Sequence, residues 1–338
     1  MKKIVVVGGG TGTHMVLRGL KAYAEYVDIT AIVTMADSGG STGRLRDEFG
    51  QLPVGDVRMA LAALAPQVGE RDDVLRQLLL YRFDKGVGLA GHNFGNLLLT
   101  ALTDITGSSS LAIEAAARLL RIEGVVVPVT IDDVHLKAVY QNGEIAIGEH
   151  HIDVPPAHLH TQLITELSVT PPARLSSEAE AALINADLIV FGPGDLYTSV
   201  LANCVVGGFK EAIERSSAQV VYVCNVMSRP GQTNGMHAAE HVAELERYVG
   251  RAPEHVIWNT TPLPEAVVER YAAQGTHPIE NNILPGKSIV HQHNLLAGEV
   301  ETPVSADSVV RSLLRHDSAN LARVLVGILE STSPRFQK

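Results

Sequence analysis

The chain has little of several residue types and patterns whose presence would point to common classes of protein. Of its 338 residues only two are cysteines, Cys204 and Cys224, and they form no C-x-x-C pair, which is typical of a reduced, cytoplasmic protein. No run of about 18 apolar residues occurs, so no membrane span is expected. The N-terminus passes from Lys2-Lys3 directly into a strand-like run, without the layout of a signal peptide.

Basic residues are also in deficit, because 27 Lys and Arg stand against 37 Asp and Glu, for a formal net charge of −10. This balance argues against general binding of nucleic acids or anionic membranes, although it leaves room for a local basic pocket. Hydrophobic residues make up 46% of the chain and charged residues 19%, which predicts a substantial core. We therefore expect one large α/β domain over residues 1–330, followed by a C-terminal tail, 331–338.

Two strand-like runs in the first quarter of the chain end in glycine-rich loops. The first run leads into Gly8-Gly-Gly-Thr-Gly12, and apolar residues then recur at helical spacing from Met15 to Ala24. The second leads into Asp37-Ser-Gly-Gly-Ser-Thr-Gly43. Glycine lets the backbone approach a ligand closely, and a following helix offers free N–H groups to an anion. The loops predict a site for a phosphorylated small molecule, most simply a nucleotide; the alternative is that each is an ordinary strand-to-helix turn.

The first loop does not match the standard nucleotide-binding fingerprints. Where G-x-G-x-x-G requires its third glycine, Thr13 follows Gly8 and Gly10, and the Lys-Ser/Thr of a Walker A loop is missing. NAD binding and P-loop phosphoryl transfer are therefore both disfavoured. Asp37 lies at the end of the second strand, where nucleotide-binding folds often hold a ribose hydroxyl.

The rest of the chain alternates between strand-like and helical segments. Short runs at 125–130, 134–140 and 144–148, with a hairpin turn at 141–143, predict a small antiparallel excursion near 125–155. Strand-like runs then return at 186–191, 219–224 and 255–258, each followed by a helical stretch, and an amphipathic helix or helix pair is expected at 307–329. The fold class that follows is α/β, with a Rossmann-like, mostly parallel sheet flanked by helices.

Polar residues at two predicted helix starts extend the candidate site. Asp56 is expected to cap a helix, and Arg58 lies in its first turn, where a cation opposes the helix dipole and so could serve a bound anion. The alternative is an exposed arginine paired with a nearby aspartate. His92, Asn93 and Asn96 stand at another helix entrance, where capping accounts for only one of them.

Histidines recur in two places without a defensible metal-ligand spacing. We expect a solvated loop, rather than a metal site, for the first set and a structural role, rather than zinc binding, for the second. The sets are His150, His151, His158 and His160, and His237, Glu240 and His241.

Several longer motifs, taken in order, resemble the gluconeogenesis factor family (YvcK-like), within the CofD-like 2-phospho-L-lactate transferase superfamily. They are GGGTG at 8–12, LRGLK at 17–21, DSGGSTGRLR at 37–46, GDVR at 55–58, GHNFGN at 91–96, GPGDLYTS at 192–199 and CNVMSRPGQT at 224–233. The likeness covers about residues 3–329. It implies a cytoplasmic regulatory protein that binds a UDP-sugar, with UDP-N-acetylglucosamine as the first ligand to test, and that links carbon metabolism to cell-envelope synthesis and cell shape.

The resemblance also implies a protein partner in cell-envelope precursor synthesis, and we expect a homo-oligomer. It further brings Tyr271, which could stack on uracil, and an arginine of the Arg311–Arg315 stretch into the candidate site. Together, the loops and the resemblance predict as ligand-binding residues Gly8, Gly9, Gly10, Thr11, Gly12, Asp37, Ser38, Gly39, Gly40, Arg44, Asp56, Arg58, His92, Asn93, Asn96, Gly192, Gly194, Asp195, Asn225, Asn259, Tyr271 and Arg315.

The chain departs from the family pattern in four places. The family often has PPGD where Leu52-Pro-Val-Gly-Asp56 stands and Asn where Met59 stands. It also often has a second aspartate where Ser38 stands and a serine where Asp195 stands. Because a paired carboxylate would be a good magnesium ligand, Ser38 disfavours metal-assisted transfer. We expect no required cofactor. The alternatives are a transferase of a phosphorylated hydroxy-acid group, with Mg²⁺ held by Asp37 and Asp56, and a scaffold whose glycine loops no longer bind a ligand.

Overall fold

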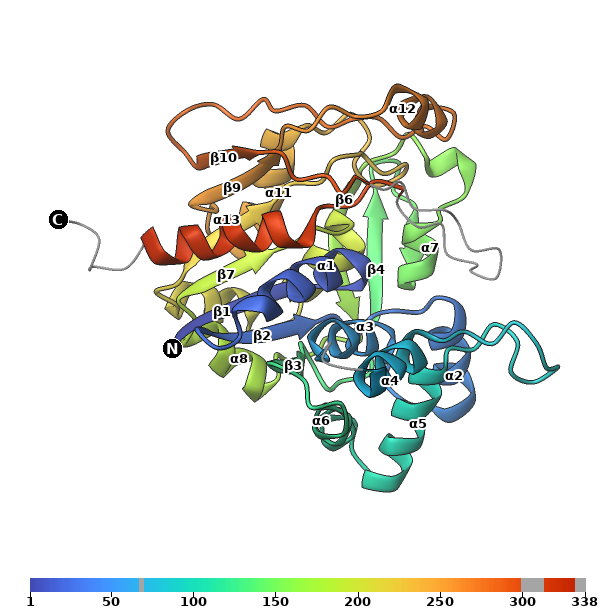
Figure 1. Ribbon diagram of the computed structural model, residues 1–338. Helices are drawn as coiled ribbons and strands as arrows, with labels where there is room; N and C mark the ends of the chain where they lie inside the picture. Colours follow the sequence, from blue (N-terminus) through green and yellow to red (C-terminus); the bar gives the residue numbers. More distant parts are fainter. Residues whose placement is uncertain (67–69, 299–312, 332–338) are drawn as a thin grey trace.

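The computed structural model describes residues 1–66, 70–298 and 313–331. Its main element is a seven-stranded sheet of order β10-β9-β8-β7-β1-β2-β3, in which every neighbouring pair is parallel (Figure 1). The strands are β1 (Lys2–Gly8), β2 (Val27–Val33), β3 (Val125–Pro128), β7 (Leu188–Phe191), β8 (Gln219–Val223), β9 (His255–Asn259) and β10 (Ile289–His293). The predicted mostly parallel sheet is confirmed, and β10 is a strand that the sequence analysis did not predict.

Strand order reverses between β1 and β7. From β1 the chain proceeds through β2 to β3 in one direction, whereas β7 pairs with the other side of β1 and is followed outward by β8, β9 and β10. Ligands of open α/β sheets bind at such a reversal, beyond the carboxyl ends of the strands. The topology thus places the loops after β1 and β7 next to each other at the expected position of a site.

A second, three-stranded antiparallel sheet of order β5-β4-β6 follows β3. The run at 125–130 does not belong to it, contrary to the prediction, because β3 pairs in parallel with β2 at the edge of the main sheet. The predicted hairpin is confirmed, because β4 (His135–Tyr140) pairs with β5 (Ile145–Ile147) across the turn at 141–143. The third strand, β6 (Ile164–Thr170), was not predicted, so the antiparallel part extends to Thr170. Between β5 and β6 the chain forms α7 (Glu149–Asp153), where a loop was expected.

Helices flank the main sheet. The helices of eight residues or more are α1 (Gly10–Leu20), α2 (Gly40–Phe49), α3 (Gly55–Leu64), α4 (Glu70–Leu80), α5 (Phe94–Thr106), α6 (Ser109–Leu120), α8 (Ser177–Ile184), α11 (Ala238–Val249), α12 (Glu265–Ala272) and α13 (Ser318–Ser331). The shorter ones are η1 (Lys21–Tyr23), η2 (Ala157–Leu159), η3 (Leu196–Leu201), α9 (Ala202–Cys204) and α10 (Phe209–Arg215). The C-terminal helix α13 confirms an amphipathic helix from Ser318 onward, whereas residues 313–317, also expected to be helical, are not. The rest of that expectation, 307–312, and residues 332–338 of the predicted tail lie outside the described residues.

The core is continuous across the main sheet and its helices. Residues Ile4–Val7 of β1 are at most 2% exposed, as expected for a strand of a parallel sheet that is covered on both faces. Helices α1 and α13 lie side by side (Figure 1), in contact so close that a Cβ at Gly19 would lie 2.0 Å from the carbonyl oxygen of Ser318. The C-terminal helix is therefore part of the same hydrophobic core as β1.

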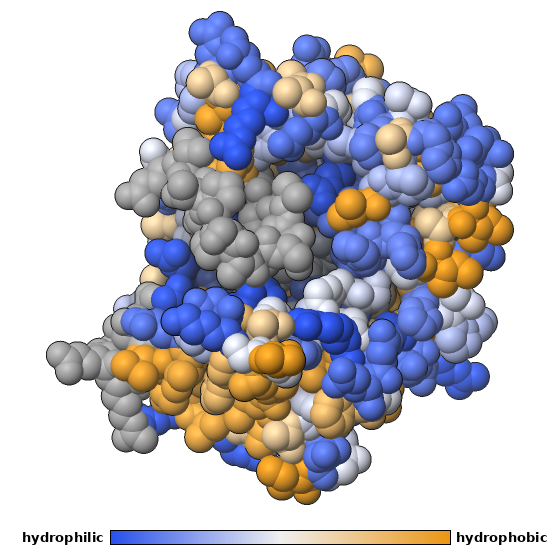
Figure 2. Space-filling model, turned by 90° about the vertical axis from the view of Figure 1, so that its right-hand side faces the viewer, coloured by the Kyte–Doolittle hydropathy of each residue, from blue (hydrophilic) through white to orange (hydrophobic). Residues whose placement is uncertain are grey.

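Exposed apolar side chains gather toward the lower part of the face shown in Figure 2, at the height of α4, α5 and α6 in Figure 1. Exposed residues of these helices include Val74, Leu78, Ile105, Leu111 and Leu119. Within the described residues, no helix combines the length and apolar character that crossing a membrane requires. The homo-oligomer expected above stays a prediction.

Candidate functional site

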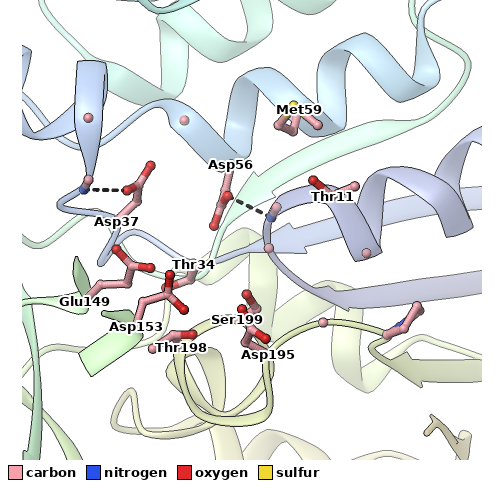
Figure 3. Close-up of a pocket in the computed structure, with 18 of the residues that line it drawn as sticks. Thr11, Thr34, Asp37, Asp56, Met59, Glu149, Asp153, Asp195, Thr198 and Ser199 are labelled. Carbon is pink, nitrogen blue, oxygen red and sulfur yellow. Dashed lines mark hydrogen bonds between the residues drawn. The ribbon is translucent and has the colours of Figure 1, made fainter. Parts of the chain in front are cut away.

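A cavity of about 660 Å³ lies at the carboxyl ends of the central parallel strands. The loops that follow β1, β2, β7 and β8 contribute to its wall, together with α7 and the residues before α13 (Figure 3). It thus lies where the reversal in strand order predicts a ligand site. The predicted ligand-binding residues that line it are Gly9, Gly10, Thr11, Gly12, Asp37, Gly39, Gly40, Asp56, Arg58, Asn96, Gly194, Asp195, Asn225 and Arg315.

The first glycine loop turns β1 into α1 at the edge of this cavity. Helix α1 begins at Gly10, and its N-cap, Gly9, has no side chain that could accept hydrogen bonds from the N–H groups of the first turn. Gly10 has a φ of +63°, a left-handed conformation that favours glycine. A Cβ at Gly12 would lie 2.0 Å from the carbonyl oxygen of Pro193, so this glycine is required for packing of α1 against the loop after β7.

Asp56 reaches from α3 to the start of α1. Its Oδ1 accepts a hydrogen bond from the backbone N–H of Gly10 at 2.8 Å, and a Cβ at Gly9 would lie 2.2 Å from its Oδ2. The prediction that Asp56 caps its own helix is wrong, because α3 begins at Gly55 after Val54 and the carboxylate serves α1 instead. Desolvation, together with the nearby charge of Asp37, raises the pKa of Asp56 from 3.8 to about 7.

The second glycine loop holds Asp37 on the same cavity. The Gly39 backbone N–H donates to Asp37 Oδ1 at 2.9 Å, and a Cβ at Gly55 would lie 2.2 Å from Oδ2. Burial raises the pKa of Asp37, although hydrogen bonds from Gly39 and Thr42 oppose this effect. Asp37 and Asp56 therefore face one cavity from adjacent glycine-containing turns, as Figure 3 shows.

Glu149, which the sequence analysis did not single out, adds a third carboxylate from α7. Its pKa lies well above the ordinary value, because it is desolvated and lies near Asp37, Asp153 and Asp56. The Ser38 hydroxyl accepts a hydrogen bond from the His150 backbone N–H at 3.0 Å, so the second glycine loop is bonded directly to the start of α7. Ser38 thus has a structural partner, and Glu149 supplies an acidic group beside it.

The opposite wall combines two more carboxylates with an arginine. Arg229 Nη2 donates to Asp153 Oδ1 at 2.7 Å, and these side chains are 26% and 14% exposed. Desolvation and the nearby charge of Asp153 raise the pKa of Asp195, although the charge of Arg229 opposes the rise. The hydroxyl-bearing residues Thr198 and Ser199 follow Asp195 on η3 and line the same wall (Figure 3).

Arg58 is buried rather than exposed, at 8%, so the surface ion pair considered as its alternative is excluded. Its Nε donates to Asn96 Oδ1 at 2.8 Å, and Asn96 Nδ2 donates to Thr42 Oγ1 at 3.2 Å. This chain of hydrogen bonds connects α3, α5 and α2 behind the two glycine loops. Arg58 and Asn96 both contribute to the cavity wall.

Eight predicted ligand-binding residues lie outside the cavity wall, and for them ligand contact stays a prediction. Asn93 caps α5 through bonds from the Gly95 and Asn96 backbones. Asn259 accepts a hydrogen bond from the Leu295 backbone N–H, and the Tyr271 hydroxyl accepts one from that of Leu313 at 2.6 Å. The others are Gly8, Ser38, Arg44, His92 and Gly192, and Arg311 lies outside the described residues.

Sequence reasoning missed several residues of the wall, among them Thr34, Met59, Arg82, Glu149, Asp153, Thr198, Ser199, Val226, Met227 and Arg229. One signal was available, since Glu149 and Asp153 are four residues apart and so share a helix face, but the proline-broken stretch around them suggested a loop. Within the described part of the chain, no group of three or more His, Cys, Asp or Glu side chains is arranged to hold a metal ion. His237 and Glu240 form a capping box and buried His241 bonds to Tyr222, which confirms the structural role expected for this set.

Comparison with known proteins identifies the family. The profile of the family described as 2-phospho-L-lactate transferase CofD matches residues 4–296. The chain belongs to this family. Among curated relatives of this CofD-like chain, the "Putative gluconeogenesis factor" of Thermotoga maritima is 41% identical over 96% of the chain and 98% of its own length. The "Gluconeogenesis factor" of Bacillus subtilis is 36% identical over 97% and 98%, respectively.

The fold of this CofD-like chain also matches a solved structure. A crystal structure of a Bacillus halodurans protein superimposes with a TM-score of 0.85 at 35% sequence identity, covering 96% of this chain and 99% of that one. The resemblance inferred from the motifs is thus confirmed at the level of family and fold.

Proposed function

We propose that the protein is a UDP-sugar-binding regulatory protein, with UDP-N-acetylglucosamine as the first ligand to test, which acts in the cytoplasm to link carbon metabolism to cell-envelope synthesis and cell shape. The observation that carries the binding part is the convergence of two helix N-termini, those of α1 and α2, on one cavity at the reversal in strand order. Helix N-termini attract phosphates, and a cavity of about 660 Å³ is of a size typical for small-molecule and cofactor sites. The regulatory part, including a protein partner in envelope precursor synthesis, rests on the family resemblance.

The acidic side chains around the cavity constrain how such a ligand binds. A diphosphate brings negative charge close to Asp37 and Asp56, whose raised pKa values already reflect desolvation and, for Asp56, repulsion by Asp37. Binding therefore requires proton uptake or a cation next to these two groups. The N–H groups at the start of α1 and the buried Arg58 supply part of the compensating positive potential.

The Asp37–Asp56 pair also favours a second candidate function, a Mg²⁺-dependent transferase of a phosphorylated hydroxy-acid group. Two facing carboxylates are hard-oxygen donors, and Mg²⁺ commonly binds through one or two carboxylates together with substrate phosphates and water. The absence of a three-ligand group among the described residues is compatible with that mode. The residues thus fit a shared cation, which would neutralise phosphate charge, while Asp37 and Asp56 would hold it at the two glycine loops.

Ligand binding is tested by thermal unfolding and calorimetry with UDP-N-acetylglucosamine, UDP-glucose and UDP. At about 100 times its dissociation constant, a ligand should raise the free energy of unfolding by roughly 2.7 kcal/mol. If no UDP compound at millimolar concentration gives a calorimetric signal or shifts the unfolding temperature, the proposed function is wrong.

The two candidate functions are separated by Asp37→Asn, titrated with UDP-N-acetylglucosamine in Mg²⁺ and in EDTA. If Asp37 accepts a hydrogen bond from a ligand hydroxyl, the substitution should weaken binding by about 1–3 kcal/mol in both conditions. If it holds a cation, wild-type affinity should collapse in EDTA and the variant should already bind at that reduced level in Mg²⁺. The second result would favour the transferase.

A further inference from the structure

One wall of the cavity has a composition that phosphate binding does not explain. Asp153, Asp195, Thr198 and Ser199 lie together below the two glycine loops in Figure 3, and Arg229 holds one of the two carboxylates. The N-termini of α1 and α2 offset the charge of Asp37 and Asp56, whereas the Arg229 cation on this wall already bonds to Asp153. This wall therefore suits a different part of a ligand from the phosphates that the helix N-termini attract.

Thr198 is a buried polar side chain that faces this wall without a partner of its own. The residue is 3% exposed and lines the cavity, and its hydroxyl makes no hydrogen bond to any other residue in the described ranges 1–66, 70–298 and 313–331. The Thr198 hydroxyl oxygen is itself accessible from the cavity, so a ligand group there can supply the hydrogen-bond partner that hydroxyl groups normally have. Thr198 lies within η3, a π-helical segment in which the Val200 N–H bonds to the Asp195 carbonyl at 3.1 Å, and π-helical turns are frequent at functional sites.

The two carboxylates beside Thr198 are held in place by their neighbours. Arg229 Nη2 donates to Asp153 Oδ1 at 2.7 Å, and the positive charge of Arg229 also attracts the neighbouring Asp195 carboxylate. Asp195 is the N-cap of η3, so Asp195 and Thr198 lie on one short segment. The two carboxyl groups offer acceptor oxygens, and the neighbouring Thr198 hydroxyl can both donate and accept. Together they can hydrogen-bond to a ligand group that carries several neighbouring hydroxyls.

We propose that Asp195, Asp153 and Thr198 form the hexose subsite of the cavity, which binds the sugar hydroxyls of a nucleoside diphosphate hexose while its diphosphate lies toward the start of α1. This inference rests on the proposed function and adds the orientation of the ligand and the residues that recognise the sugar. Arg229 is a positioning residue here, because its contact is with Asp153. The subsite favours a neutral, hydroxylated group, since an additional phosphate would meet two carboxylates.

The test compares the affinity for UDP with that for UDP-N-acetylglucosamine and UDP-glucose, measured by calorimetry in the same buffer. The ratio of the dissociation constant of UDP to that of each UDP-sugar isolates the contribution of the sugar. Thr198→Val removes the hydroxyl at nearly constant volume, and Asp195→Asn removes one charge. We expect each to lower this ratio by about 5- to 10-fold, the equivalent of one hydrogen bond, with the affinity for UDP unchanged.

Matched variants separate the subsite from general effects. Thr198→Ser keeps the hydroxyl and should retain the wild-type ratio, and Asp47→Asn, at an exposed aspartate away from the cavity wall, should leave both affinities unchanged. Unfolding temperatures confirm that each variant is folded. Unchanged ratios in both Thr198→Val and Asp195→Asn would overturn the hexose subsite, even if wild-type protein binds every ligand. A wild-type protein that binds neither UDP nor a UDP-sugar would instead overturn the proposed function, and the subsite with it.

Discussion

Asp56 accepts a hydrogen bond from the backbone N–H of Gly10, across 46 residues of sequence. The bond connects the first turn of α3 to the first residue of α1 and places a carboxylate where a helix N-terminus would otherwise attract an anion. In the first glycine loop, the Gly10 N–H is therefore already bonded to a carboxylate and is not free for a phosphate. A phosphate that binds at α1 has to lie beside Asp56, and the protonation of Asp56 affects both stability and binding.

The contribution of Asp56 to stability should depend on pH. Its pKa is raised from 3.8 to about 7, so the folded state binds the proton more tightly than the unfolded state. The free energy of unfolding should therefore fall, on account of Asp56, as the pH rises from about 4 to about 7, and the loss should be constant above that range. Buried histidines act in the opposite direction, since the pKa values of His14, His241 and His316 are lowered to about 4.

The measurement is thus a difference between wild type and Asp56→Asn, obtained by urea unfolding at several pH values. Asparagine keeps the acceptor oxygen for the Gly10 N–H and cannot ionise. Wild type should lose stability relative to the variant between about pH 4 and pH 7. A difference that does not change with pH would show that Asp56 titrates normally in the folded protein.

Two neighbouring glycines should differ in what they tolerate. Gly10→Ala makes only an ordinary contact, with Asp56 Oδ1 at 3.9 Å, but places alanine in a left-handed conformation, which costs about 1–2 kcal/mol. Gly12→Ala puts a methyl group 2.0 Å from the backbone oxygen of Pro193, so the loop after β7 has to move, and we expect a loss of about 3 kcal/mol or more. Chemical denaturation of both variants checks the order, and equal losses would contradict the packing role assigned to Gly12.

Tyr271 should support ligand binding through its hydroxyl rather than its ring. The hydroxyl accepts hydrogen bonds from the backbone N–H groups of Leu313 and Leu314, directly before Arg315, which lines the cavity. Tyr271→Phe should therefore weaken UDP-sugar binding by about tenfold, as expected for loss of one hydrogen bond that orders this segment.

Stacking of the tyrosine on uracil predicts the contrary result, because phenylalanine keeps the ring. A double-mutant cycle with Arg315→Ala provides the control. If Tyr271 acts through this segment, the two effects should not add, whereas independent contacts with the ligand should give additive effects.

Asn93 should contribute to stability as a helix cap. Its side chain accepts from the Gly95 N–H at 2.9 Å and the Asn96 N–H at 3.3 Å, and it lies outside the cavity wall. Asn93→Ala should lower the free energy of unfolding by about 1 kcal/mol and leave ligand affinity nearly unchanged. A large loss of affinity without loss of stability would restore the direct ligand contact predicted for Asn93.

Much of the fold and part of the site follow from local features of the sequence. Buried apolar runs followed by glycine-rich loops, such as those before Gly8 and Asp37, identified the central strands. They were recognisable because hydrophobic periodicity and turn chemistry depend on a few neighbouring residues. The hairpin at 141–143 and the helix α13 were predictable for the same reason. The motifs also identified the family, since sequence motifs of this length rarely occur outside one family.

The tertiary structure alone decided which distant groups share the cavity. Glu149 and Asp153 come from a short helix in a proline-containing stretch, and β10 has exposed or half-exposed residues, so neither produced a clear local pattern. Asp56 carries a typical capping residue type, yet the folded chain directs it to Gly10 of another helix. Such contacts depend on how the sheet order brings separate segments together. This long-range packing produces no periodic pattern in the local sequence from which it could be predicted.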